Sequence, residues 1–302
     1  MKPAEMVIST TADVQAPDGD YMRITTLIVL VMAAVLLAGC TQQAAQPTPV
    51  PTAAVAPDTI RTATSPLGTI LMDARGMTLY YFANDIPASG ISSCSGQCAV
   101  AWPVFFVDSV KVSPPLDAAD FGSITRADGT KQTTYYGWPL YYWQGDTKPG
   151  DVSGENVQKV WFVMRPDEQV LIAHTTDLGL YLTDTTGKTL YYFTKDTAGT
   201  STCTGACLAK WPAFSTGPVS APSVLKESDF SAVSRSDGMK QTAFMGRPLY
   251  YFADDAQPGD VKGQGFGSAW YVANVSGYTP APVPTTLNTL SPSGSGYGGG
   301  GY

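Results

Sequence analysis

The chain has 302 residues, of which 44% are hydrophobic and 14% charged, and its 25 acidic against 18 basic side chains give a formal net charge of −7. An acidic chain with no run of Lys or Arg lacks the electrostatic surface that nucleic-acid binding requires, so we expect no nucleic-acid partner. The single His excludes a His-rich metal site and leaves few routes to imidazole acid–base catalysis.

Residues 1–39 are predicted to be an export signal. Residues 24–37 (ITTLIVLVMAAVLL) form an apolar run that suits the core of a signal peptide and is short for a membrane-spanning helix. Arg23 precedes this run and Leu37-Ala38-Gly39-Cys40 follows it. This end resembles a lipoprotein signal, in which the chain is cut before the cysteine and the thiol receives a lipid.

The resemblance implies cleavage before Cys40 and lipidation of that residue. Residues 1–21 are polar and acidic, unlike the start of a signal peptide, so Met22 is the expected true start. The alternative left open is an uncut membrane anchor. In both cases the rest of the chain is expected outside the cytoplasmic membrane, attached to its outer face, where disulfides can form.

Two segments are predicted to be disordered. Residues 40–65 carry the lipidated cysteine and a stretch rich in Pro, Thr, Ala and Gln, which we interpret as a semi-extended tether. Residues 279–302 are first Pro- and Thr-rich and then Gly-rich. Neither segment can bury enough apolar surface to offset the entropy of ordering it.

The region between these segments is an internal repeat. The string TLYYFANDIPASGISSCSGQCAVAWP begins at Thr78, and TLYYFTKDTAGTSTCTGACLAKWP begins at Thr189. The register between the copies holds without insertion from their cysteines to their final Trp residues. We predict two homologous domains, residues 66–168 and 177–278, joined by a short connector that contains His174.

A shorter motif, Leu-Tyr-Tyr-(Phe/Trp)-x-x-Asp, occurs four times and gives each domain an internal pseudo-repeat. Each copy follows a turn signal, and the runs before it are short and rich in β-formers, which is typical of hairpins. Only the segments after the second Cys of each domain are expected to be helical, for about one turn. The predicted fold is all-β, mostly antiparallel. The motif residues are Tyr80, Phe82 and Asp85; Tyr141, Trp143 and Asp146; Tyr191, Phe193 and Asp196; and Tyr250, Phe252 and Asp255.

The motif is interpreted as a core strand followed by a capped turn. Residues two apart in a strand share a face, so the first Tyr and the Phe or Trp of each copy are expected to point together. The Asp comes where the strand ends and can accept backbone N–H bonds in an Asx-turn. The functional alternative is that these Asp residues, with Asp151 and Asp260, bind Ca²⁺.

The Y-x4-D strings, the C-x3-C-x3-W-P strings and the lipoprotein-like N-terminus together resemble a family of secreted-repeat lipoproteins whose hallmark is a Y-x-(F/W/Y)-x-x-D motif. The resemblance covers residues 66–278, and Trp143 stands where the other three copies have Phe. It implies exported, repeated domains without an established biochemical role.

Four cysteines remain once Cys40 is assigned to the lipid. An even number outside the cell favours disulfides, and the repeat favours a local bridge within each C-x3-C pair, Cys94 with Cys98 and Cys203 with Cys207. Two alternatives remain open: a redox-active dithiol, and a zinc site drawing all four thiolates together.

The functional prediction is an exported, membrane-anchored lipoprotein without catalytic activity, cofactor or metal site. Its role is expected in cell-envelope structure or in binding an extracellular protein, glycan or small molecule. The alternatives are an extracytoplasmic redox or electron-transfer accessory that uses the cysteine pairs, and Ca²⁺ binding through the Asp turns.

Overall fold

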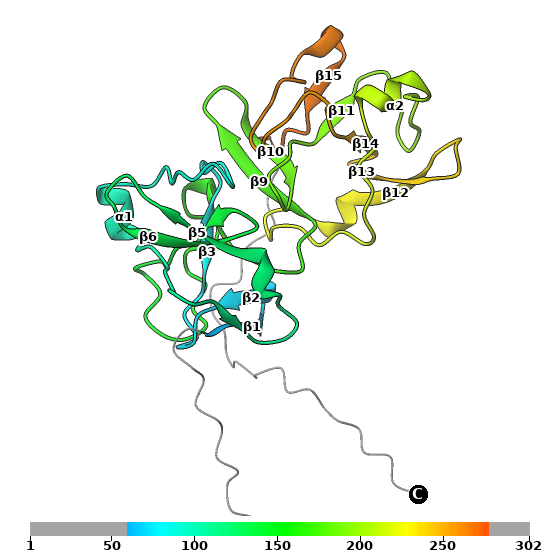
Figure 1. Ribbon diagram of the computed structural model, residues 1–302. Coiled ribbons are helices and arrows are strands. Elements are labelled where there is room, and N and C mark those ends of the chain that lie inside the picture. The colour runs from blue at the N-terminus through cyan, green and yellow to red at the C-terminus, as the bar shows by residue number, and fades with distance from the viewer. Residues whose placement is uncertain (1–58, 278–302) are drawn as a thin grey trace, which may run out of the picture. The chain divides into compact units, whose positions relative to one another are not determined.

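A computed structural model of the chain describes residues 59–277 and shows mostly short strands with two five-residue α-helices (Figure 1). The predicted signal peptide, Cys40, most of the tether and the C-terminal tail lie outside the described residues. The prediction of an all-β, mostly antiparallel fold built from repeats is confirmed. We refer to residues 59–168 as the first half and to residues 170–277 as the second half.

The two halves contain the same elements in nearly the same order. The first half has β1 (Thr59–Ser65), β2 (Gly68–Met72), β3 (Tyr80–Phe82), α1 (Gln97–Ala101), β4 (Lys111–Val112), β5 (Phe121–Thr125), β6 (Lys131–Tyr135), β7 (Trp138–Pro139) and β8 (Trp161–Val163), with 3-10 turns at Ala118–Asp120 and Val157–Lys159. The second half has β9 (Val170–Thr175), β10 (Gly179–Asp184), β11 (Tyr191–Phe193), α2 (Ala206–Lys210), β12 (Phe230–Ser234), β13 (Lys240–Phe244), β14 (Arg247–Tyr250) and β15 (Trp270–Val272), with 3-10 turns at Glu227–Asp229 and Phe266–Ser268.

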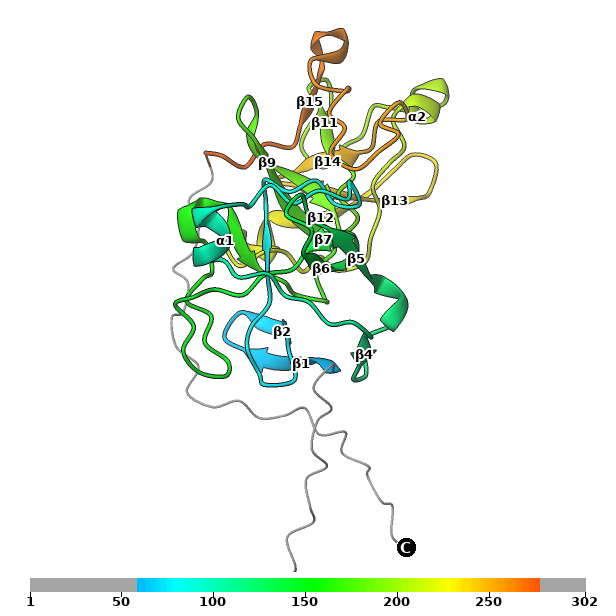
Figure 2. The same cartoon turned by 60° about the vertical axis from the view of Figure 1, so that its left-hand side comes forward.

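Antiparallel pairing dominates the sheets. The second half contains a five-stranded sheet in the order β12-β13-β14-β11-β15 and the pair β10-β9. The first half has the sheets β5-β6-β7, β3-β8 and β2-β1-β4, and only its β1–β4 contact is parallel among the strand pairs of residues 59–277. Both short helices lie at the periphery of the strands, as two views of the ribbon show (Figures 1 and 2).

Two of the turn signals that precede a motif copy are Gly137-Trp138-Pro139 and Gly246-Arg247-Pro248, and both form the predicted hairpins. β6 pairs with β7 and β13 with β14, both antiparallel. The first connection has positive φ at Tyr136 (47°) and Gly137 (84°). Two consecutive residues with positive φ suit a two-residue type I′ turn, whose twist matches that of the strands it joins.

The tether prediction is wrong for residues 59–65, which form β1. Ile60 and Ala63 are buried, and the strand pairs with both β2 and β4. The segment has no apolar periodicity of its own, but strands on both sides supply its backbone hydrogen bonds. The first half therefore includes residues 59–65, ahead of the boundary predicted at residue 66.

The predicted connector before residue 177 is also a strand. Residues Val170–Thr175 form β9, and Val170, Leu171, Ile172 and Ala173 are all buried. β9 is the counterpart of β1 in the second half and pairs with β10. The His174 ring is half-buried, and its Nδ1 lies 2.7 Å from the Asn84 side-chain oxygen.

Buried side chains also connect the halves. Trp138 donates its ring N–H to the carbonyl of Thr185 at 3.0 Å. Glu155 accepts from the Ser223 hydroxyl at 2.6 Å with one carboxylate oxygen and from the backbone N–H of Val163 at 2.6 Å with the other. In the second half Gln264 takes the place of Glu155, since its side-chain oxygen accepts from the backbone N–H of Val272 at 2.9 Å.

Candidate functional site: the paired Y-x4-D motifs

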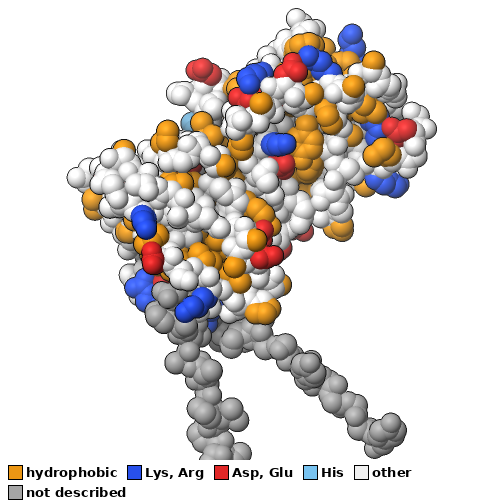
Figure 3. Space-filling view, in the orientation of Figure 1, with side chains coloured by type: hydrophobic (Ala, Val, Ile, Leu, Met, Phe, Trp, Pro, Cys, Tyr) orange, Lys and Arg blue, Asp and Glu red, His pale blue; other side chains and the backbone are white. Residues whose placement is uncertain are grey.

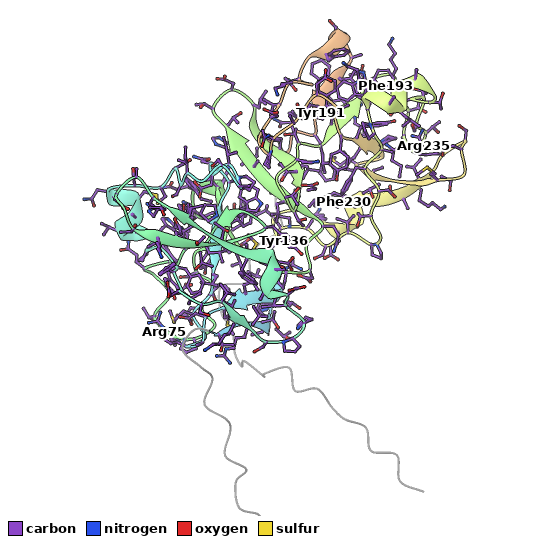
Figure 4. The ribbon with its side chains drawn as sticks, in the orientation of Figure 1. Arg75, Tyr136, Tyr191, Phe193, Phe230 and Arg235 are labelled. Atoms are coloured by element: carbon purple, nitrogen blue, oxygen red, sulfur yellow. A yellow bond between two sulfur atoms is a disulfide. The ribbon has the colours of Figure 1, made fainter. Side chains whose placement is uncertain are left out.

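The first tyrosines of the two motifs in each half lie next to each other in the core. Tyr80 and Tyr141 exchange two backbone hydrogen bonds, N–H to carbonyl at 2.9 and 3.0 Å. Tyr191 of β11 pairs in the same way with Tyr250 of β14. All four side chains are fully buried. In each half, the two motifs therefore lie side by side and pair antiparallel through their first tyrosines. Tyr191 and Phe193 of β11 are labelled in Figure 4.

In the first half, each tyrosine hydroxyl binds the aspartate of the other motif. The Tyr80 hydroxyl donates to Oδ2 of Asp146 at 2.7 Å. The Tyr141 hydroxyl donates to Oδ2 of Asp85 at 2.6 Å. Hydrogen bonds from a hydroxyl to a carboxylate are short and strong when both groups are buried. The two motifs thus hold each other reciprocally.

The second half repeats this arrangement. The Tyr191 hydroxyl donates to Oδ2 of Asp255, and the Tyr250 hydroxyl donates to Oδ2 of Asp196, each at 2.6 Å. The eight predicted motif tyrosines and aspartates therefore come together in two equivalent clusters, four residues in each half.

The other carboxylate oxygen of each Asp accepts a backbone N–H from a following loop. The expectation of a local Asx-turn is wrong, because the bonded N–H lies six to eight residues further along the chain and not two. The donors are Ser93 for Asp85, Ser153 for Asp146, Thr202 for Asp196 and Lys262 for Asp255. Each Asp therefore ties its strand to a loop as well as to the partner motif.

Burial changes the proton affinity of these groups. It raises the pKa of Asp85 to about 6, and it raises the pKa of Asp146 and Asp255 above the ordinary value. Burial also raises the pKa of Tyr80 and Tyr141, so their phenols remain neutral donors. In the first half, the motifs thus pair neutral hydroxyls with the carboxylates of Asp85 and Asp146, whose ionisation burial disfavours.

A buried arginine in each half extends the network toward a cysteine. Arg126 donates to the side chains of Ser92 and Gln132, at 2.7 and 2.6 Å, and to the carbonyl of Cys94. The Ser92 hydroxyl lies 2.5 Å from that of Tyr141, which connects the arginine to the Tyr–Asp pair. The counterparts in the second half are Arg235, Ser201, Gln241 and Cys203, and Arg235 is labelled in Figure 4.

Sequence reasoning missed these arginines. They occur in the strings RADGTKQ and RSDGMKQ, which stand at equivalent places in the two copies. The sequence signal for them was an Arg and a Gln that recur at the same spacing around a predicted hairpin turn in both copies. Their burial was not predictable, because it depends on the loop that carries the first cysteine of each pair.

Both predicted disulfides are present. Cys94 is bonded to Cys98 and Cys203 to Cys207, with 5.3 Å between the Cα atoms in each pair. The first cysteine of each pair is buried, and the second lies in α1 or α2. Because the four sulfurs are oxidised in pairs, they offer no thiolates for the zinc alternative.

Aromatic rings stack beside each disulfide. Trp102 lies between Trp161, with ring centroids 3.8 Å apart, and Trp143, at 4.3 Å, and Phe82 covers the far face of Trp161 at 4.1 Å. The second half repeats the stack with Phe193, Trp270, Trp211 and Phe252. The predicted shared face of the first Tyr and the third aromatic of each motif thus forms part of this core.

Ca²⁺ binding through the Asp turns finds little support in this geometry. Both oxygens of Asp85 and of Asp146 already accept hydrogen bonds. Within residues 59–277 no group of three or more His, Cys, Asp or Glu side chains is placed to hold a metal ion.

Comparison with known proteins identifies a family for the chain. The sequence model of a family described as a secreted repeat of unknown function matches four stretches, residues 61–105, 122–165, 173–215 and 231–274. The chain belongs to this family. No curated protein and no solved structure matched in two further searches.

Each of the four secreted repeats contains one Y-x4-D motif, and each half contains two secreted repeats. The reciprocal Tyr–Asp bonds therefore run between repeats and never within one. The family description indicates an extracytoplasmic location. The helices that the structure describes within residues 59–277 lack the length and apolar character of a membrane span.

Proposed function

We propose that the chain is an exported lipoprotein, anchored by a lipid on Cys40 to the outer face of the cell membrane. Its secreted repeats then form a non-catalytic module that serves cell-envelope structure or binds an extracellular partner. The Leu-Ala-Gly-Cys sequence after the apolar run and the family's secreted character support the anchor. The Pro-rich sequence after Cys40 suits a spacer between membrane and module.

The reciprocal Tyr–Asp bonds are the observation that carries the non-catalytic part of this proposal. An active site keeps its polar groups accessible to a substrate, whereas here the hydroxyls of Tyr80 and Tyr141 and the carboxylates of Asp85 and Asp146 bond one another in the core. Hydrogen-bonded polar groups of this kind specify a fold.

The redox alternative has one observation in its favour. A cation beside a cysteine stabilises its thiolate, and Arg126 and Arg235 contact the carbonyls of Cys94 and Cys203. Lys210, the cation nearest the second pair in sequence, is engaged elsewhere, since its Nζ lies 2.8 Å from a carboxylate oxygen of Asp254.

Lipid attachment is tested by expressing the full chain and Cys40→Ser in cells fed a clickable fatty acid. We expect the wild-type protein to carry the label and to sediment with membranes, and Cys40→Ser to lose the label. Cys98→Ser is the matched control and should stay labelled, because it alters a cysteine of the folded module. An unlabelled wild-type protein, or equal labelling of Cys40→Ser, would contradict the anchor.

A further inference from the structure

The two halves share a tight turn before the first motif of each. In the first half, Oδ1 of Asp73 accepts the backbone N–H of Arg75 and of Met77, both at 2.9 Å. In the second half, Oδ1 of Asp184 accepts the backbone N–H groups two and four residues later, at 2.9 and 3.0 Å. The turns are therefore equivalent residue by residue.

A tyrosine from the second motif of each half binds the other oxygen of this Asp. The Tyr142 hydroxyl donates to Oδ2 of Asp73 at 2.9 Å. The Tyr251 hydroxyl donates to Oδ2 of Asp184 at 3.0 Å. Each half thus presents a carboxylate beside the ring of a tyrosine.

The first half supplies its own cation to this pair. Arg75 donates its Nε–H to Oδ2 of Asp73 at 2.9 Å, and its guanidinium carbon lies 5.5 Å from the centre of the Tyr142 ring. The Arg75 side chain remains 71% exposed, so the carboxylate and the ring hold it from one side only. Arg75 is labelled at the lower left of the folded part in Figure 4.

The second half has the same pair without the arginine. Thr186 stands at the position of Arg75, and its short side chain is bonded back to Oδ1 of Asp184 at 2.8 Å. A cavity of about 380 Å³ lies here, lined by Asp184, Thr186, Lys188, Tyr251 and Asp255, among others. Its volume is in the range of small-ligand sites, roughly 300–1,000 Å³.

The chemistry of the pair selects a guanidinium group. A guanidinium is planar, donates in a fixed fork that matches a carboxylate, and stacks on aromatic faces, whereas an ammonium is a compact and strongly hydrated point charge. Arg75 donates one hydrogen bond to the carboxylate, through Nε, and lies over the tyrosine ring on the matching residues of the first half.

We propose that the cavity beside Asp184 and Tyr251 binds an arginine side chain of a polypeptide partner, in the manner in which Asp73 and Tyr142 hold Arg75. The proposal rests on the proposed role in extracellular binding and names the partner chemistry for that role. Lys188 lines the same cavity, where the first half has Met77, and its positive charge weakens the attraction for a second cation.

The test is a titration of the purified exported chain with N-acetyl-arginine amide, followed by two-dimensional amide NMR, with the uncharged citrulline analogue in parallel. We expect arginine-dependent shifts of the amides of Thr186 and Lys188 and none with citrulline. Thr186→Arg, which copies the first half, should weaken binding about tenfold or more. The new side chain would itself make the charge-assisted hydrogen bond to Asp184 that the ligand makes in the wild type. Thr186→Ser is the matched control and should bind as the wild type does.

Two further variants use the comparison between the halves. Lys188→Met should tighten binding by about two- to fivefold, because it removes a like charge from the cavity. Arg75→Thr should produce a second set of shifts at the amides of residue 75 and Met77. The proposal would be overturned if the wild type showed no shifts, or equal shifts with citrulline. It would also be overturned if Thr186→Arg kept the shifts, if Lys188→Met bound no more tightly, or if Arg75→Thr showed no second set of shifts. Each of these outcomes is independent of whether Cys40 carries a lipid.

Discussion

Single buried carboxyls set the ionisation behaviour of the module. Glu155 is buried at the junction of the two halves, and burial raises its pKa to about 7. Arg165 acts in the opposite direction by favouring the charged form. Gln264 makes the equivalent backbone contact in the second half without an ionisable proton. This pair of residues allows the cost of one buried carboxyl to be measured.

We predict that the Glu155 carboxyl makes the protein less stable as the pH rises. Its pKa in the folded state lies above the ordinary value of 4.5, so the folded state holds the proton between about pH 4.5 and 7 while the unfolded state releases it. The free energy of unfolding therefore falls across this window, by roughly 3 kcal/mol for this group.

Glu155→Gln, which copies Gln264, should remove this part of the fall. Urea unfolding of both proteins at several pH values from 4.5 to 8 measures it. A smaller slope should remain in the variant, because burial also raises the pKa of Asp85 and Glu168. Identical pH dependence in the two proteins would show that Glu155 is not held in a protonated state by the fold.

At the scale of elements, each disulfide fixes a short helix beside a core strand. The bridge from Cys94 to Cys98 closes at the start of α1, where Gly96 has a φ of 57°. Trp102 follows this helix and lies at the centre of the aromatic stack. The disulfide thereby positions the ring on which the core of the first half is built.

Removing one bridge by a Cys94→Ala and Cys98→Ala double substitution should lower the free energy of unfolding by about 2 kcal/mol, the loop-entropy value for so short a loop. The equivalent change at Cys203 and Cys207 should cost a similar amount, because the two bridges have the same environment. Differential scanning calorimetry measures both.

Thiol titration of the wild-type protein in mild reductant distinguishes structural disulfides from redox-active ones. Bridges that stay closed in mild reductant until the protein unfolds fit a structural role. Bridges that open in the folded protein, with little change in the melting temperature, would favour a redox accessory.

Much of this architecture was predictable from repetition along the chain. Tyr141 and Asp85 were identified as motif residues because the string recurs four times, and both disulfides followed from matched cysteine spacing. The sequence could not show that Tyr141 binds Asp85 and not Asp146 of its own motif, because the order of residues within a motif does not determine which strand lies beside it. Strand β1 was missed because neighbouring strands, and no apolar pattern of its own, define it. Strand β9 was missed although its apolar run from Val170 to Ala173 is typical of a buried strand.

For the whole molecule, the structural unit is a pair of secreted repeats. A single repeat leaves its tyrosine without the carboxylate and its aspartate without the hydroxyl that the other repeat supplies. Buried polar groups without partners cost about 1–3 kcal/mol each. This explains why four repeats form two halves, and why the core of each half contains two Y-x4-D motifs.

Charged side chains of both signs lie scattered over the face shown in Figure 3.

The most direct test of this pairing is a double-mutant cycle on the free energy of unfolding of the full chain. It combines Tyr141→Phe with Asp85→Ala, the reciprocal partner, and separately with Asp146→Ala, the aspartate of the same motif. We predict a coupling energy of about 1–3 kcal/mol for Tyr141 with Asp85 and additivity within about 0.5 kcal/mol for Tyr141 with Asp146. Equal coupling in both cycles, or none between Tyr141 and Asp85, would contradict the reciprocal pairing of the repeats.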